Sequence, residues 1–184
     1  MTLLKRQAAD ATQEDDTPLA DTDHHLSHVD LPYVTSMHPS PLELLILEVS
    51  RCFCHGWTNG DVGAWDHAFQ VCDERFGPIE GPAFVARVIS LMRTILSERR
   101  SGLRYMPVGC TRICKDEETL MRAVQGAIRG DAQALRSAVA TLTFTKRPEK
   151  TTTLTAAQVL GVFCHRYDLA AGSQDAQPSR RTLN

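Results

Sequence analysis

The strongest constraint on the fold is a run of apolar residues at helical spacing in the middle of the chain. Its members recur over four turns: Phe84, Val85, Val88, Ile89, Met92, Ile95 and Leu96. This period places them on one face of an α-helix, with Arg87 and Arg93 on its other sides. A helix with one apolar face has to bury it against other elements, so residues 84–102 are predicted to form the centre of a packed domain.

Five further segments repeat the same period. The first begins at Ser40-Pro41, where a capping residue precedes a proline at the first helical position. The six expected helices cover approximately residues 40–56, 59–76, 84–102, 116–129, 131–142 and 155–167. The fourth and fifth are joined by Gly130-Asp131 and are expected to form an αα-hairpin. The sequence therefore predicts an all-α protein, a small bundle of about five to six helices.

The ends of the chain differ from this middle part in composition. Residues 1–39 are polar and acidic and have no sustained apolar period, which predicts a disordered acidic tail. Residues 172–184 are expected to form a second disordered tail. The predicted organisation is thus one helical domain, residues 40–171, between a disordered N-terminal tail and a disordered C-terminal tail.

The apolar segments are too short for a membrane protein. None reaches the roughly 18 uncharged residues of a membrane-spanning helix, and Leu3-Leu4 is too short for the apolar region of a secretory signal. We expect a cytoplasmic protein without a membrane partner. In that compartment the six cysteines would be thiols, metal ligands or redox groups.

Charge is distributed unevenly along the chain. Residues 1–84 have a net charge of −10, whereas residues 85–147 hold 12 Lys/Arg and 5 Asp/Glu, a net of +7. Six basic residues and one tyrosine around the irregular segment 103–115 are the predicted partner-binding surface: Arg99, Arg100, Arg104, Tyr105, Arg112, Lys115 and Arg122. A protein partner is expected, with nucleic acid as an alternative. Two further alternatives are a homodimer and simple neutralisation of the basic part by the acidic part.

Two similar segments suggest a metal site. Residues 49–57 and 159–167 each hold Val, then Phe four residues later, then Cys-His and an aromatic residue. If the first and last helices packed together, four ligands suited to zinc would converge: Cys54, His55, Cys164 and His165. Adjacent helical residues point about 100° apart, so each Cys-His pair would have to lie where its helix has ended. Gly56 allows such an end at the first segment.

A second cysteine pair is Cys110-x-x-x-Cys114. On one helical turn the two thiols would share a face and could bind a metal ion or an iron–sulfur cluster. They could equally form a redox pair, with Arg112 and Lys115 lowering the thiol pKa. The alternative for all six cysteines is that they fill the core.

No familiar catalytic or nucleotide-binding motif is present. The chain has no phosphate-binding glycine loop, no Gly-x-Ser-x-Gly and no His-Glu-x-x-His. No catalytic residue is assigned and no cofactor is expected. The sequence therefore predicts a non-enzymatic helical regulatory or protein-interaction module, in the style of a small bacterial accessory protein. The alternative is a metal-binding or redox-sensing protein based on cysteine and histidine.

Overall fold

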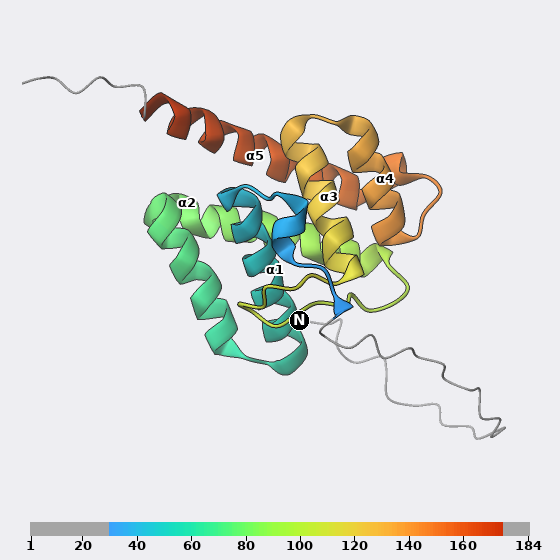
Figure 1. Cartoon of the computed structure of the whole chain (residues 1–184), viewed down its shortest axis with the longest axis horizontal. Coiled ribbons are helices and arrows are strands. Elements are labelled where there is room, and N and C mark those ends of the chain that lie inside the picture. Colours follow the sequence, from blue (N-terminus) through green and yellow to red (C-terminus); the bar gives the residue numbers. More distant parts are fainter. Residues whose placement is uncertain (1–29, 175–184) are drawn as a thin grey trace, which may run out of the picture.

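The computed structural model describes residues 30–174, with the side chains of residues 168–174 excepted. This part of the chain is a bundle of five α-helices without a strand, which confirms the predicted all-α class (Figure 1). The helices are α1 (Pro41–Asn59), α2 (Val62–Glu98), α3 (Lys115–Arg129), α4 (Ala132–Thr143) and α5 (Thr152–Gln174). Two short 3₁₀-helices, η2 (Val34–Met37) and η3 (Pro148–Lys150), precede α1 and α5.

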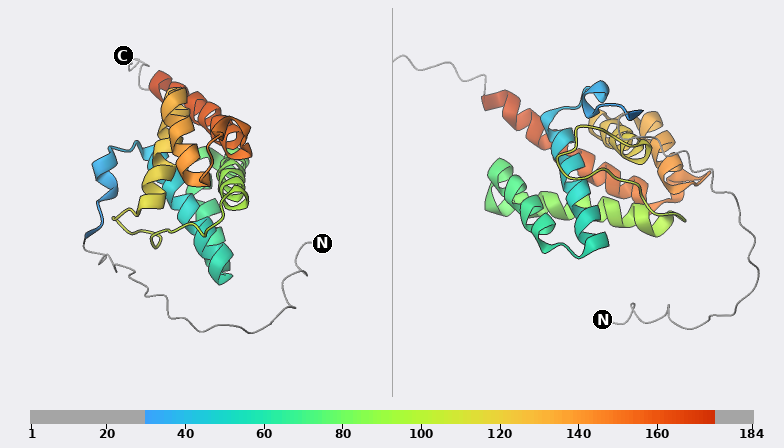
Figure 2. Two further views of the ribbon diagram at one scale, coloured as in Figure 1. Left: turned by 90° about the vertical axis from the view of Figure 1, so that its right-hand side faces the viewer. Right: turned by 60° about the horizontal axis from the view of Figure 1, so that its bottom comes forward.

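Helix α1 lies between the first half of α2 and the α3–α4 hairpin, and the views in Figure 2 agree on this arrangement. Helix α5 packs along both α2 and α3. The predicted central helix supplies much of the core, since Phe84, Val88, Met92 and Ile95 are fully buried. Ile89 is only partly buried and packs at the edge of the core. Leu96 is likewise partly buried, so the predicted apolar face includes positions at the edge of the core.

Helix α2 combines the second and third predicted helices. The chain bends at Gly77, whose φ of 82° and ψ of 171° are readily adopted only by glycine. Pro78 then occupies the first turn of the new helical segment, where a proline has no hydrogen bond to lose. The Gly-Pro pair thus marks a kink, and the helix continues at once in a new direction.

The predicted hairpin is formed by α3 and α4. Gly130 ends α3 with a φ of 70°, and the Asp131 carboxylate accepts hydrogen bonds from the backbone N–H groups of Gln133 and Ala134. The two helices approach closely at Gly126, where an added Cβ would lie 2.8 Å from the backbone N of Leu135. A glycine at this position therefore sets the spacing of the hairpin.

The predicted boundary between tail and domain at residues 39 and 40 is wrong, because residues 30–39 already belong to the packed structure. Val34 is buried against Leu47, Ile113 and Met121. Its N–H donates to the carbonyl of Thr111 at 2.9 Å. A segment anchored by one side chain and by backbone hydrogen bonds has no apolar period to detect. At the other end, α5 continues through residues 172–174, and the rest of both predicted tails (1–29 and 175–184) lies outside the described residues.

Candidate partner-binding groove

A buried ion pair between Arg51 in α1 and Glu117 in α3 organises the region around the predicted binding surface. The two side chains are 5% and 2% exposed, and Arg51 Nε donates to Glu117 Oε1 at 2.7 Å. Arg51 also donates to the backbone carbonyls of Cys110 and Arg112, at 2.6 and 2.7 Å. Removing the guanidinium charge from water costs free energy. Each hydrogen bond that a buried N–H of this group forms offsets part of that cost.

The same carboxylate fixes the irregular segment before α3. Glu117 accepts hydrogen bonds from the backbone N–H groups of Met106 and Cys114, at 2.9 and 3.0 Å. Next to it, Asp116 accepts from the backbone N–H of Arg104 at 2.9 Å. Residues 104–114 are therefore held in one conformation, although they have no regular secondary structure.

Arg99 and Arg112, two of the seven predicted partner-binding residues, hold their guanidinium groups against other parts of the chain. Arg99 pairs with Asp116 at 2.8 Å, and its guanidinium lies 4.8 Å from the centroid of the Phe144 ring. The guanidinium of Arg112 lies over Tyr33 and donates to the carbonyl of Leu31 at 2.7 Å. These two arginines stabilise the fold, so the freely exposed part of the predicted basic surface is smaller than expected.

The remaining predicted residues fall into two groups. Arg100 and Arg104 are exposed on the segment between α2 and α3, and Tyr105 is partly buried against the core. Lys115 and Arg122 lie on α3 with side chains 76% and 60% exposed. The structure thus separates the α3 cations from those of the preceding loop.

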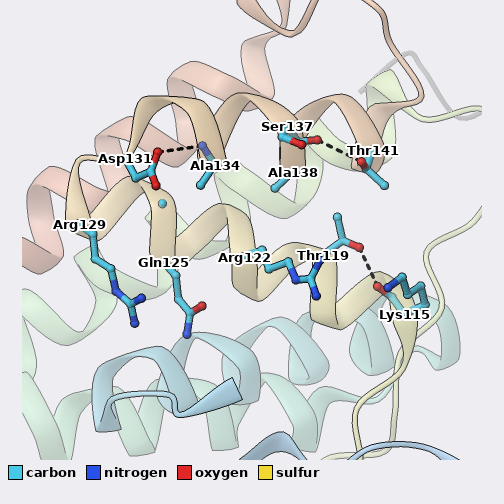
Figure 3. Close-up of a pocket in the computed structure, with 11 residues that line it drawn as sticks. Lys115, Thr119, Arg122, Gln125, Arg129, Asp131, Ala134, Ser137, Ala138 and Thr141 are labelled. Carbon is cyan, nitrogen blue, oxygen red and sulfur yellow. Dashed lines mark hydrogen bonds between the residues drawn. The ribbon is translucent and has the colours of Figure 1, made fainter. Parts of the chain in front are cut away.

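The α3 cations line a groove between α3 and α4 with a volume of about 500 Å³ (Figure 3). Arg129, which the sequence reasoning did not include, joins Lys115 and Arg122 in it and is 62% exposed. Figure 3 shows Arg129 and Gln125 extending from α3 on the side away from α4. The α4 edge of the groove carries small and hydroxyl-bearing residues: Ala134, Ser137, Ala138 and Thr141.

Carboxylates balance part of this charge. Glu118 contacts both Lys115 and Arg122, and Arg129 lies 3.9 Å from the buried carboxylate of Glu43. Ion pairs between exposed side chains contribute little free energy. The groove therefore presents three exposed cations, each with a carboxylate nearby.

The Cys-His pairs do not converge. Cys54 and Cys164 are buried in the core, His165 is exposed, and His55 lies 3.2 Å from Asp61. Helix α1 continues past Gly56 to Asn59, and α5 continues past residue 165, so neither pair lies at a helix end as a shared ion would require. Within residues 30–167, whose side chains the structure describes, no three His, Cys, Asp or Glu side chains are placed to hold a metal ion together.

The Cys110–Cys114 pair also differs from the expectation. Cys110 lies in the loop and Cys114 is the N-cap of α3, so the two do not share a helical turn. Burial raises the pKa of Cys114 to about 11. The same effect, with smaller contributions from Glu117 and Cys114, raises the pKa of Cys54 to about 12. The predicted lowering of the Cys114 pKa by Arg112 and Lys115 is wrong, because these cations contact Tyr33 and Glu118 instead.

Three important residues were missed by the sequence reasoning. Arg51 stands directly before Cys52 and Phe53 in α1, and a charged side chain that is buried among such residues needs a partner. Glu117 stands three residues after the N-cap of α3, the position of a capping-box acid. Arg129 follows Arg122 by the same seven residues that separate Arg122 from Lys115, and this spacing could have identified it.

Comparison with known proteins gives no relative: no protein-family model matches the chain, and neither a curated protein nor a solved structure matches it. Among the described residues, no helix combines the length and apolar character needed to cross a membrane.

Proposed function

We propose that this chain is a non-enzymatic protein-interaction module that binds an acidic partner protein through the α3–α4 groove, in a regulatory role. One observation carries the proposal. Three exposed cations, Lys115, Arg122 and Arg129, line one groove beside a strip of small residues. Cations gathered along one surface raise the local potential, which steers an anionic partner and favours its binding.

The chemistry of the groove favours protein over nucleic acid as the partner. No aromatic side chain lines it, so it offers no platform for stacking bases. The carboxylate of Asp131 lines one end, and that of Glu118 contacts two of the cations. Carboxylates at these positions repel the evenly spaced phosphates of a nucleic-acid backbone. They repel a protein less, because its acidic side chains are separate from one another.

A cytoplasmic location is part of the proposal. All six cysteines lie in the described part of the chain, and no disulfide joins any two of them. Thiols of this kind are typical of proteins in a reducing compartment.

Binding of polyglutamate to the full chain tests the proposal. Replacing Lys115, Arg122 and Arg129 together by serine should weaken binding by about tenfold or more at low ionic strength, since every exposed cation of the groove is lost. The matched control replaces three exposed cations elsewhere, Arg75, Lys150 and Arg166, by serine. This control has the same net charge and should bind like the original chain.

Equal losses in the two triple variants would show that net charge alone governs binding and would contradict the proposal. So would unchanged binding of the groove variant. A duplex DNA oligonucleotide that binds the groove more tightly than polyglutamate does would favour the nucleic-acid alternative. Circular dichroism and the thermal midpoint of each variant would verify that the fold is retained.

A further inference from the structure

We infer that the partner segment is an amphipathic α-helix whose acidic residues recur at every seventh position. This inference rests on the proposed function and specifies the kind of partner that the α3–α4 groove accepts. Two features carry it: the spacing of the three cations and the character of the groove floor.

The cations follow a heptad spacing along α3. Lys115, Arg122 and Arg129 are each seven residues apart, which is almost two helical turns. Successive members drift by only about 20° around the helix, so all three lie along one edge. At a rise of 1.5 Å per residue they stand about 10 Å apart along the axis.

This spacing matches another helix better than it matches an extended chain. A helix lying alongside α3 has the same rise, so its residues at heptad positions meet Lys115, Arg122 and Arg129 in turn. An extended peptide presents side chains to the same side about every 7 Å, out of step with cations that are about 10 Å apart. Charge complementarity along the whole edge therefore selects a helix.

The floor of the groove is shaped for a helix as well. Gly126 lies where α3 and α4 touch, and Ala134 and Ala138 line the adjoining part of α4, so no side chain larger than a methyl group stands at these three positions. A floor of this kind admits the ridge of side chains on a third helix. Recognition of an amphipathic helix in a groove is a common mode of peptide binding.

Two of the three side-chain hydroxyl groups in the groove form hydrogen bonds to the helices that carry them. Thr119 donates to the carbonyl of Lys115 at 2.8 Å, and Thr141 donates to the carbonyl of Ser137 at 3.0 Å (Figure 3). These two hydroxyl donors already have acceptors within the chain, so they do not require a ligand. A partner is thus expected to place its apolar face over the floor and its acidic edge against the three cations.

Two synthetic three-heptad peptides of identical composition test this inference. Both have an alanine- and leucine-rich face and three glutamates; one has them at heptad spacing, the other at five-residue spacing. The full chain should bind the heptad peptide at least about tenfold more tightly. Arg122→Glu should abolish this preference, and changing the middle glutamate of the peptide to lysine should restore binding to that variant.

The outcomes separate the inference from the function that it rests on. Equal affinity for the two peptides, or failure of the lysine peptide to restore binding, would overturn the helical partner and leave the acidic partner intact. A folded chain that binds neither peptide nor polyglutamate would overturn both. Arg136→Glu, a charge reversal on an exposed α4 residue outside the groove lining, is the control and should retain the preference.

Discussion

The guanidinium of Arg112 lies 3.7 Å from the centroid of the Tyr33 ring, and this contact ties the chain before α1 to the loop before α3. The two residues also form an isolated antiparallel bridge, continued by a hydrogen bond from the N–H of Ile113 to the carbonyl of Pro32. A residue predicted to bind a partner therefore stabilises the packing of the N-terminal segment. Buried Val34 follows directly and joins the small second apolar cluster.

This packing predicts different effects for two deletions. Removal of residues 1–38 exposes the cluster around Val34 and should lower the free energy of unfolding by roughly 1.5–3 kcal/mol, the contribution of one buried valine. Removal of residues 1–29 leaves the packing around Val34 in place. This deletion should change the free energy of unfolding by less than about 0.5 kcal/mol. Urea denaturation of the three proteins measures both effects. Equal stability of the two truncated chains would contradict the role of residues 30–38.

The buried ion pair predicts a sharp contrast between neighbouring glutamates. Glu117→Ala leaves the charge of Arg51 buried without its carboxylate and should cost about 3–5 kcal/mol of stability. Glu118→Ala removes only exposed ion pairs and should cost less than about 1 kcal/mol. Chemical denaturation gives both values. Similar losses at the two positions would mean that Glu117 does not organise the loop.

Glu98 predicts an acid-dependent loss of stability. Burial raises the pKa of its carboxyl, but hydrogen bonds from Thr152 and Thr153 outweigh burial and hold the pKa below its ordinary value of 4.5. A lowered folded-state pKa gives stability that is complete above the ordinary value and is lost as pH falls through the folded-state pKa. Glu98→Gln should therefore reduce the slope of stability against pH in the acid range.

Glu149→Gln, at an exposed position, serves as the control for the loss of one carboxylate. Thermal unfolding at a series of pH values from neutral to acid gives the slopes. If the stabilities of the Glu98→Gln and Glu149→Gln variants have the same slope against pH, the hydrogen bonds from Thr152 and Thr153 to Glu98 do not stabilise the start of α5.

The buried cysteines predict slow reaction with alkylating reagents. Because burial raises the pKa of Cys54 and Cys72 to about 12, the reactive thiolate is scarce at neutral pH. Iodoacetamide should therefore label these two positions in the native protein far more slowly than in urea, as measured by mass spectrometry of tryptic peptides. Rapid native labelling of Cys54 or Cys72 would support the redox-sensing alternative instead.

The helical class followed from the sequence because apolar periodicity and end signals are local. Ser40 is the N-cap of α1, as its position before proline predicts, and Gly130 ends α3. The Gly77 kink was predicted as a break between helices, since a sequence does not show whether a chain resumes a helix after a turn. The packing of residues 30–39 depends on contacts with a loop about 80 residues away, for which local patterns hold no signal.

The candidate site was predicted only in part for the same reason. Local charge density marked residues 85–147 as basic, but it did not separate the inward-facing Arg99 and Arg112 from the exposed Lys115 and Arg122. That distinction depends on partners such as Asp116 and Phe144, which only the folded chain brings together. The metal hypothesis was made from residue types without knowledge of where each helix ends.

Mapping the bound acidic peptide by NMR tests the central claim most directly. The full isotope-labelled chain would be titrated with the three-heptad acidic peptide, and its backbone amide shifts followed. The largest changes are expected on both edges of the groove, at residues 115–129 of α3 and residues 134–141 of α4. Changes centred on the loop around Arg100 and Arg104, or on the exposed Trp57 at the end of α1, would contradict it.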